Sequence, residues 1–118
     1  MRQEEAVETR QRSLEAWRLA DRGLRRIHDG EYEEAGKDIR SAIERGVASG
    51  EIYASLGDAL TATAGDDRLS TEDRAAALAE AEESYRLARK IGVADPLTRL
   101  RIERSLNRLS LPRHQRVN

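Results

Sequence analysis

Residues able to do acid-base or metal chemistry are few in this chain and stand apart from one another. The chain has two histidines, His28 and His114, and no cysteine. Neither histidine has a nucleophile or an acid at the spacing of a catalytic motif, and there is no glycine-rich phosphate loop. We expect His28 to be an ordinary residue at the C-terminus of a helix, where a cation is favoured. The sequence therefore predicts neither enzyme activity nor a cofactor.

Four carboxylates, at Asp66, Asp67, Glu72 and Asp73, lie close together in the sequence and raise the question of a calcium loop. Such a loop alternates oxygen ligands around a central glycine and ends in a glutamate. That alternation is missing here. We expect a solvated loop and the start of a helix at this place, with no metal ion.

A basic stripe is formed by Arg101, Arg104 and Arg108, because steps of three and four residues keep side chains on one helical face. Residues 95–118 hold six arginines against two carboxylates, although the net charge of the chain is −1. A solvated face is the favoured interpretation, followed by a site for an acidic patch on another protein. Nucleic acid is the least favoured partner, since so small a patch makes few phosphate contacts.

The composition indicates one small helical domain. The chain has 118 residues, of which 38% are hydrophobic and 36% charged, with apolar residues recurring at helical intervals. No apolar run approaches the ~20 residues of a membrane span, and the opening MRQEEAVETR is too polar for a signal peptide. We expect a cytoplasmic, all-α protein without a membrane partner.

Helix ends are marked by four glycines, at Gly30, Gly46, Gly65 and Gly92, each of which follows a periodic segment. A left-handed glycine in that place lets the last carbonyls of a helix find donors. Helix starts are indicated by Ser70 or Thr71 and by the Asp95-Pro96 pair. The expected helices span residues 3–28, 31–45, 50–64, 71–91 and 96–110.

The chain also contains a repeat. A shift of 34 residues aligns Leu19, Ala20 and Gly23 with Tyr53, Ala54 and Gly57. A shift of 46 residues aligns Ala35, Ile39, Ala42 and Gly46-Val47-Ala48 with Ala81, Tyr85, Ala88 and Gly92-Val93-Ala94. The two shifts predict two helix-turn-helix units of about 34 residues, the second carrying a 12-residue insertion at 66–77. We expect the insertion to lengthen the fourth helix at its N-terminus. The added turns either contact a partner or a second copy, or are a tolerated surface extension.

These residues resemble the tetratricopeptide repeat (TPR) family. The resemblance rests on Tyr53-x-x-Leu56-Gly57-x-x-Leu60, on Gly30-x-Tyr32-x-x-Ala35-x-x-x-Ile39-x-x-Ala42, and on Ala81-x-x-x-Tyr85-x-x-Ala88. It covers residues 17–94 and implies a right-handed stack of two helical hairpins. The first helix departs from the pattern, because Arg22 and Arg26 stand in the places of Leu56 and Leu60.

The resemblance divides a single domain of residues 1–111 into repeats. Repeat one covers 17–49 and repeat two covers 50–94, followed by a capping helix over 95–110 and a flexible basic tail over 112–118. The shift of 46 places Glu103 where the close-packing Gly57 stands. A large charge there suits a helix that ends the stack.

The resemblance also implies a concave groove that holds a peptide or helical segment of another protein. Carried over by the shifts, the groove residues are Trp17, Leu24, Ile27, His28, Glu51, Asp58, Thr61, Leu97, Leu100, Arg104, Asn107 and Arg108. Trp17 and Leu24 are either anchors for that partner or core residues covered by the rest of the chain. The two-carboxylate clamp of the family has no counterpart on the first and third helices.

We therefore expect a non-enzymatic adaptor or scaffold. Two other classes stay open. One is a homo-oligomer that assembles through the first helix, and the other is a nucleic-acid accessory protein that uses the C-terminal arginines.

Overall fold

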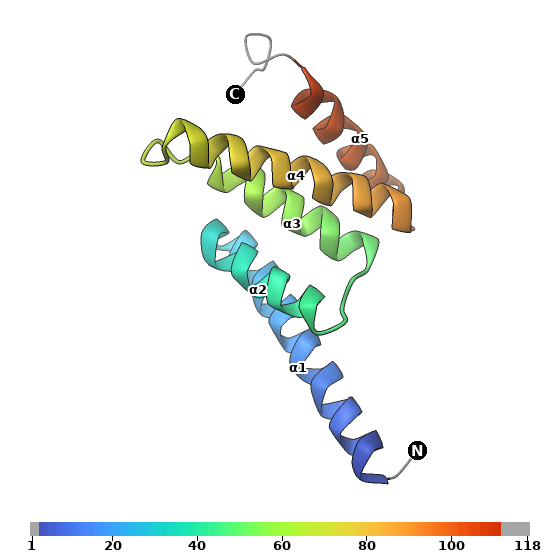
Figure 1. The fold of residues 1–118 in the computed structure, drawn as a ribbon. Helices are drawn as coiled ribbons and strands as arrows, with labels where there is room; N and C mark the ends of the chain where they lie inside the picture. Colours follow the sequence, from blue (N-terminus) through green and yellow to red (C-terminus); the bar gives the residue numbers. More distant parts are fainter. Residues whose placement is uncertain (1–2, 112–118) are drawn as a thin grey trace. The chain divides into compact units, whose positions relative to one another are not determined.

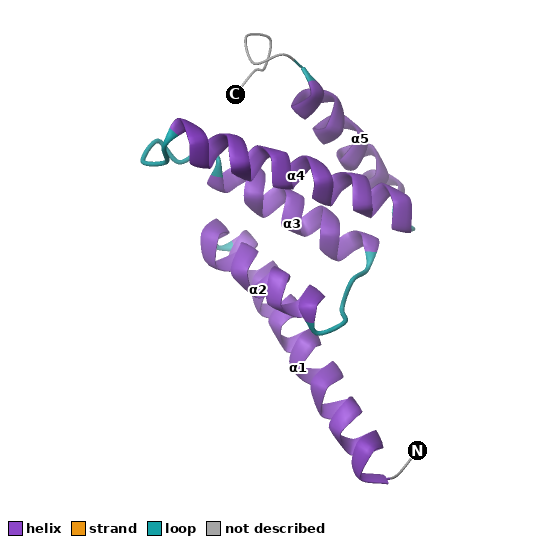
Figure 2. Ribbon diagram, in the orientation of Figure 1, coloured by secondary structure: helices purple, strands orange, loops and turns teal. Residues whose placement is uncertain are grey.

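The computed structural model describes residues 3–111, and every regular element in that range is an α-helix (Figures 1 and 2). The helices are α1 (Gln3–His28), α2 (Tyr32–Glu44), α3 (Gly50–Thr63), α4 (Thr71–Ile91) and α5 (Pro96–Ser110). Each expected helix is confirmed, with both ends within one residue of the sequence prediction. The predicted basic tail, with His114, lies outside the described residues.

The chain divides into two compact units, residues 1–48 and residues 49–118. In unit 1, α1 and α2 pack against each other as a pair. In unit 2, α3 and α4 form a second pair, and α5 packs mainly against α4. The fold is thus all-α, with consecutive helices packed as adjacent pairs.

Glycines with positive φ follow three of the helices, as predicted. Gly30, Gly46 and Gly92 have φ of 81°, 106° and 100°. The prediction was wrong for the conformation of Gly65, whose φ is not positive. There α3 runs on into a right-handed turn, in which the N–H of Gly65 donates to the carbonyl of Ala62 at 3.1 Å, so no left-handed residue is needed.

Side-chain caps start the last two helices. The Oγ of Ser70, rather than Thr71, accepts a bond from the backbone N–H three residues on, at 3.0 Å. The carboxylate of Asp95 does the same for Thr98 at 3.1 Å, and Pro96 follows as the first helical residue. Both caps satisfy N–H groups that a helix start leaves without a partner. They fix where α4 and α5 begin.

In each pair the two helices approach closely at a glycine. A Cβ at Gly23 of α1 would lie 2.7 Å from the Cγ1 of Ile39 in α2. A Cβ at Gly57 of α3 would lie 2.7 Å from the Cζ of Tyr85 in α4. Gly57 follows Gly23 by 34 residues and Tyr85 follows Ile39 by 46, so the two pairs make the same contact at aligned positions.

The two units differ in what surrounds that contact. In unit 1 the buried apolar side chains are mostly small, and they are Ala16, Ala20, Ala35, Ala42 and Val47 around Ile39. In unit 2, α5 adds Ile102, Leu106 and Leu109 to the buried residues of α3 and α4. The predicted insertion falls in unit 2, where α4 has 21 residues against 13 in α2.

Candidate functional site

The predicted groove residues of unit 1 are accessible on α1. Trp17 is 58% exposed and Leu24 is 42% exposed, while His28 is exposed and Ile27 is half-buried. Neither Trp17 nor Leu24 therefore belongs to the core of unit 1. An exposed tryptophan leaves a large apolar area in water, and tryptophan is enriched at interfaces.

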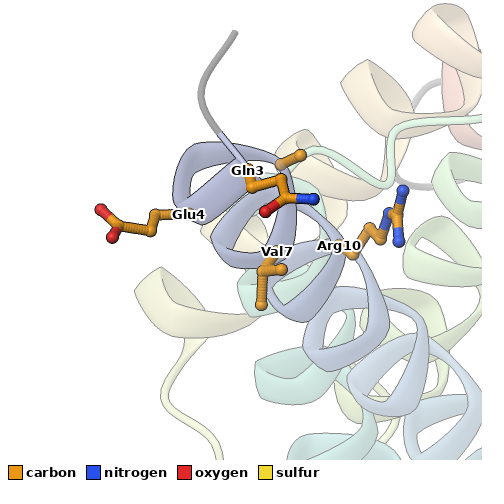
Figure 3. A pocket seen from close by; sticks show the side chains of 5 residues that line it. Gln3, Glu4, Val7 and Arg10 are labelled. Atoms are coloured by element: carbon orange, nitrogen blue, oxygen red, sulfur yellow. The ribbon is translucent and has the colours of Figure 1, made fainter.

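Two more apolar side chains are exposed on the same helix. Val7 is 49% exposed and Leu14 is 56% exposed. In Figure 3, Val7 lies at the start of α1 beside Arg10, whereas Glu4 points away from Arg10. Together with Trp17 and Leu24 these residues form a row, which we call the α1 stripe. The sequence prediction missed its first half.

The predicted residues of α3 are engaged within unit 2. Glu51 accepts a bond from the backbone N–H of Ala94 at 3.4 Å, and the Oγ1 of Thr61 donates to the carbonyl of Gly57 at 2.8 Å. The carboxylate of Asp58 links the three helices of the unit. Its Oδ1 accepts a bond from the hydroxyl of Tyr85 at 2.5 Å, and its Oδ2 lies 3.2 Å from the guanidinium of Arg101.

This arrangement shifts the pKa values of Asp58 and Tyr85. Burial is the main cause that raises the pKa of Asp58, while the bond from Tyr85 and the charge of Arg101 act to lower it. Burial and the nearby Asp58 carboxylate raise the pKa of Tyr85 well above its ordinary value. Tyr85 therefore stays protonated and donates its hydrogen bond throughout the physiological range.

The predicted residues of α5 lie on a face that combines apolar and basic groups. Leu97 is 76% exposed and Leu100 is 46% exposed, and Arg104, Asn107 and Arg108 are exposed as well. An open hollow of about 350 Å³ is lined by Leu97, Leu100, Arg101, Arg104, Ser105 and Arg108. We call these six residues the α5 face. Its leucines and arginines lie on the side of the helix away from Ile102, Leu106 and Leu109, which are buried, and Ser105 is half-buried at the border.

A cluster of charges that the sequence prediction missed lies between α1 and α2. Arg22 binds Asp38 through two bonds, Nε to Oδ2 at 2.9 Å and Nη2 to Oδ1 at 2.8 Å. Arg26 adds a third bond, from Nη1 to Oδ2 of Asp38 at 2.9 Å. Asp38 is 4% exposed. The hydrogen bonds from Arg22, with the charges of both arginines, hold the pKa of Asp38 below its ordinary value against the effect of burial.

The repeat explains why these charges occur together. By the shifts of 34 and 46, Arg22, Arg26 and Asp38 align with Leu56, Leu60 and Ser84 of unit 2. Two arginines thus replace two leucines, and the aspartate that neutralises them replaces a small residue. In the sequence, the replacement of all three residues together was the only sign of the cluster. We therefore interpret the cluster as a packing feature of unit 1.

The carboxylates that raised the question of a calcium loop lie in the loop before α4 and in its first turn. Asp66 binds Arg68 through Oδ2 at 2.9 Å and also accepts a bond from the Arg68 backbone N–H, both of which lower the pKa of Asp66. Glu72 and Asp73 lie in the first turn of α4, where negative charge is favoured. Within residues 3–111, no three histidine or carboxylate side chains gather as a metal site would require.

Comparison with known protein families, with curated proteins and with solved structures found no match for this chain. Among the described residues, no helix combines the length and the apolarity that crossing a bilayer requires. The geometry of the helix faces is therefore the basis for assigning a role.

Proposed function

We propose that this protein is a non-enzymatic adaptor that binds an acidic, amphipathic segment of another protein on the α5 face. One observation carries the proposal. Two large leucines, Leu97 and Leu100, lie exposed beside arginines on a helix whose opposite side is buried. A face with this composition offers an apolar centre and a basic border.

The charges determine what kind of segment would bind. Arg101 is already paired with Asp58, whereas Arg104 and Arg108 extend the basic border along the helix. Guanidinium groups bind carboxylates with short, charge-assisted hydrogen bonds, and exposed leucines accept apolar anchors. A helix with leucines on one side and glutamates beside them complements both features.

We further propose that the two hairpins are successive repeats of the TPR kind. The support is the aligned contact of Gly23 with Ile39 and of Gly57 with Tyr85. Under the same shift of 46, α5 aligns with α3 and takes the place of the first helix of a further repeat. In TPR-like proteins the first helices carry the partner-binding residues, which agrees with a binding role for α5.

The proposal is tested with the full chain and a labelled synthetic helix that carries leucines and glutamates. We expect binding measured by fluorescence anisotropy, and a loss of at least about tenfold in affinity for the Arg104→Glu, Arg108→Glu variant. A peptide with lysines in place of its glutamates should prefer that variant. The matched control is Arg86→Glu, Lys90→Glu on α4, which makes the same charge change elsewhere in unit 2. Equal affinity of the wild type and both variants would contradict the proposal.

A further inference from the structure

The α1 stripe has the spacing of a coiled-coil seam. Val7, Leu14, Trp17 and Leu24 follow one another at intervals of seven, three and seven residues. Such intervals place side chains at the a and d positions of a heptad repeat, on one side of a helix. All four side chains are exposed, by 49, 56, 58 and 42%. Four large apolar groups exposed along one side of a helix mark an interaction surface.

The stripe and the core of unit 1 lie on different sides of α1. The buried residues Ala16, Ala20 and Gly23 face α2. At 100° per residue, the stripe lies about 120° around the helix from them. A second helix can therefore pack on the stripe without displacing α2.

The first half of α1 has no helix beside it within unit 1. α1 has 26 residues and α2 has 13, and the buried residues of α1 begin at Ala16 (Figure 1). Within unit 1 this stretch lacks the tertiary packing from which most helical stability in proteins comes. It nevertheless carries Val7 and Leu14 at seam positions, which indicates that another helix packs there.

The order of residues along the seam identifies that helix. Two copies of α1 placed antiparallel about the midpoint between Glu15 and Ala16 bring each residue i opposite residue 31 − i. Val7 then meets Leu24 of the second copy, and Leu14 meets Trp17. Between Val7 and Leu24, the two polar seam positions also match, because Arg10 meets Asp21 of the second copy.

The charges beside the seam agree with the same arrangement. The first turn of α1 is acidic, with Glu4 and Glu5, and its last turn is basic, with Arg25, Arg26 and His28. Antiparallel copies bring Glu4 within about one turn of Arg25 of the second copy and also oppose the helix dipoles. A parallel pair would place every one of these charges against its own kind.

Asp21 is available for the new contact. It now lies 3.4 Å from Arg25 in an exposed pair on the same helix, an interaction of little energy. If Asp21 leaves Arg25 and pairs with Arg10 of a second copy, at the edge of the apolar seam, little free energy is lost.

We propose that α1 binds α1 of a second copy of this chain as an antiparallel, two-fold symmetric pair, with Leu14 against Trp17 at its centre. Each copy contributes the same surface, as a two-fold interface requires. The site is distinct from the α5 face, so a dimer of this kind presents two copies of that face.

Cross-linking tests the register, because the chain has no cysteine of its own. Val7→Cys and Leu24→Cys are prepared as separate full-length proteins and oxidised alone and as an equal mixture. We expect a disulfide-linked dimer in the mixture and none from either protein alone, because two copies of position 7 lie roughly 25 Å apart in the antiparallel pair, beyond the reach of a disulfide. Bridging of Val7→Cys with itself would show a parallel pair and overturn the proposal. No bridging in any sample would overturn it too.

Sedimentation tests the energetics. We expect a dimer for the wild type and a rise of at least about 30-fold in its dissociation constant for Trp17→Asp. Ile91→Asp, at a 50% exposed position on α4, is the matched control and should leave the dimer intact. Arg10→Asp and Asp21→Arg should each weaken the dimer, and the variant with both changes should restore it. A wild-type monomer, or singles no weaker than the double variant, would contradict the antiparallel seam.

Discussion

Gly57 of α3 lies so close to Tyr85 of α4 that a Cβ on the glycine would approach the ring to 2.7 Å. Gly23 and Ile39 repeat this relationship at the aligned positions of unit 1, again at 2.7 Å. The absence of a side chain at one position allows a large side chain at the other to fill the space between the helices. The two hairpins therefore pack in the same way at this contact, with a glycine on the first helix against a large side chain on the second, although most of the surrounding residues differ.

A side chain added at that contact should destabilise unit 2. Gly57→Ala forces a Cβ into the ring of Tyr85, and we expect a loss of about 1–3 kcal/mol in the free energy of unfolding. Gly36, in the middle of α2, has nothing within 4 Å of a built Cβ. Gly36→Ala should therefore stabilise the protein by about 0.5–1 kcal/mol through helix propensity. Urea unfolding followed by circular dichroism measures both changes, and effects of the same sign would contradict this packing.

The three charged residues of the unit 1 cluster, Arg22, Arg26 and Asp38, should contribute to stability as a coupled set. Asp38→Ser leaves two arginines without their carboxylate, and we expect a loss of about 1–3 kcal/mol, moderated because Arg22 is half-exposed. Adding Arg22→Leu and Arg26→Leu gives unit 1 the aligned residues of unit 2. The triple variant should recover most of the lost stability, because a buried ion cluster and an apolar set of similar size are often equivalent. A triple variant less stable than Asp38→Ser would contradict this.

Stability should depend on pH with opposite signs at two aspartates. The pKa of Asp38 is lowered in the folded protein, so its contribution is present above the unfolded pKa of about 3.9 and is lost as the pH falls through the folded value. The pKa of Asp58 is raised, so its contribution is largest at low pH and falls as the pH rises through the folded value. We expect the stability difference from wild type to shrink on acidification for Asp38→Asn and to grow for Asp58→Asn. Chemical unfolding at a series of pH values provides the check, and parallel trends would exclude this assignment.

The hydroxyl of Tyr85 should contribute to the packing of unit 2. Tyr85→Phe removes the donor 2.5 Å from Asp58, and we expect a loss of about 1–2 kcal/mol. Tyr53→Phe, on the same unit, is the control and should change stability by less than about 0.5 kcal/mol. In a double-mutant cycle, Tyr85→Phe and Asp58→Asn should together cost less than the sum of their separate effects. Additive effects would show that the two groups are not coupled.

The helices and their ends could be predicted from the sequence, because local chemistry determines them. Gly30 and Gly46 end helices by adopting positive φ, and Asp95 starts one with its carboxylate. Gly65 was misassigned because a glycine is compatible with either hand, and only the following turn decides which it takes. The close contact at Gly57 was recognisable because it occurs twice.

The candidate sites could be predicted only in part, since exposure depends on which elements pack together. Trp17 is large and apolar, as core residues commonly are. It is exposed because α2 packs on another side of α1. Asp58 was predicted as a groove residue, but its bonds to Tyr85 and Arg101, on two other helices, could not be predicted from helical spacing. The partner of Arg22 lies 16 residues away on another helix, where no helical spacing points to it.

Photo-cross-linking tests most directly whether the α5 face is a binding surface. Benzoylphenylalanine is placed at Leu97 or Leu100, and at the exposed Glu44 of α2 as the control, and the full-length proteins are irradiated in extract of the native host. The proposal predicts one partner protein cross-linked from positions 97 and 100, absent from position 44 and lost with Arg104→Glu, Arg108→Glu. No adduct from the α5 face, or the same adducts from position 44, would contradict it.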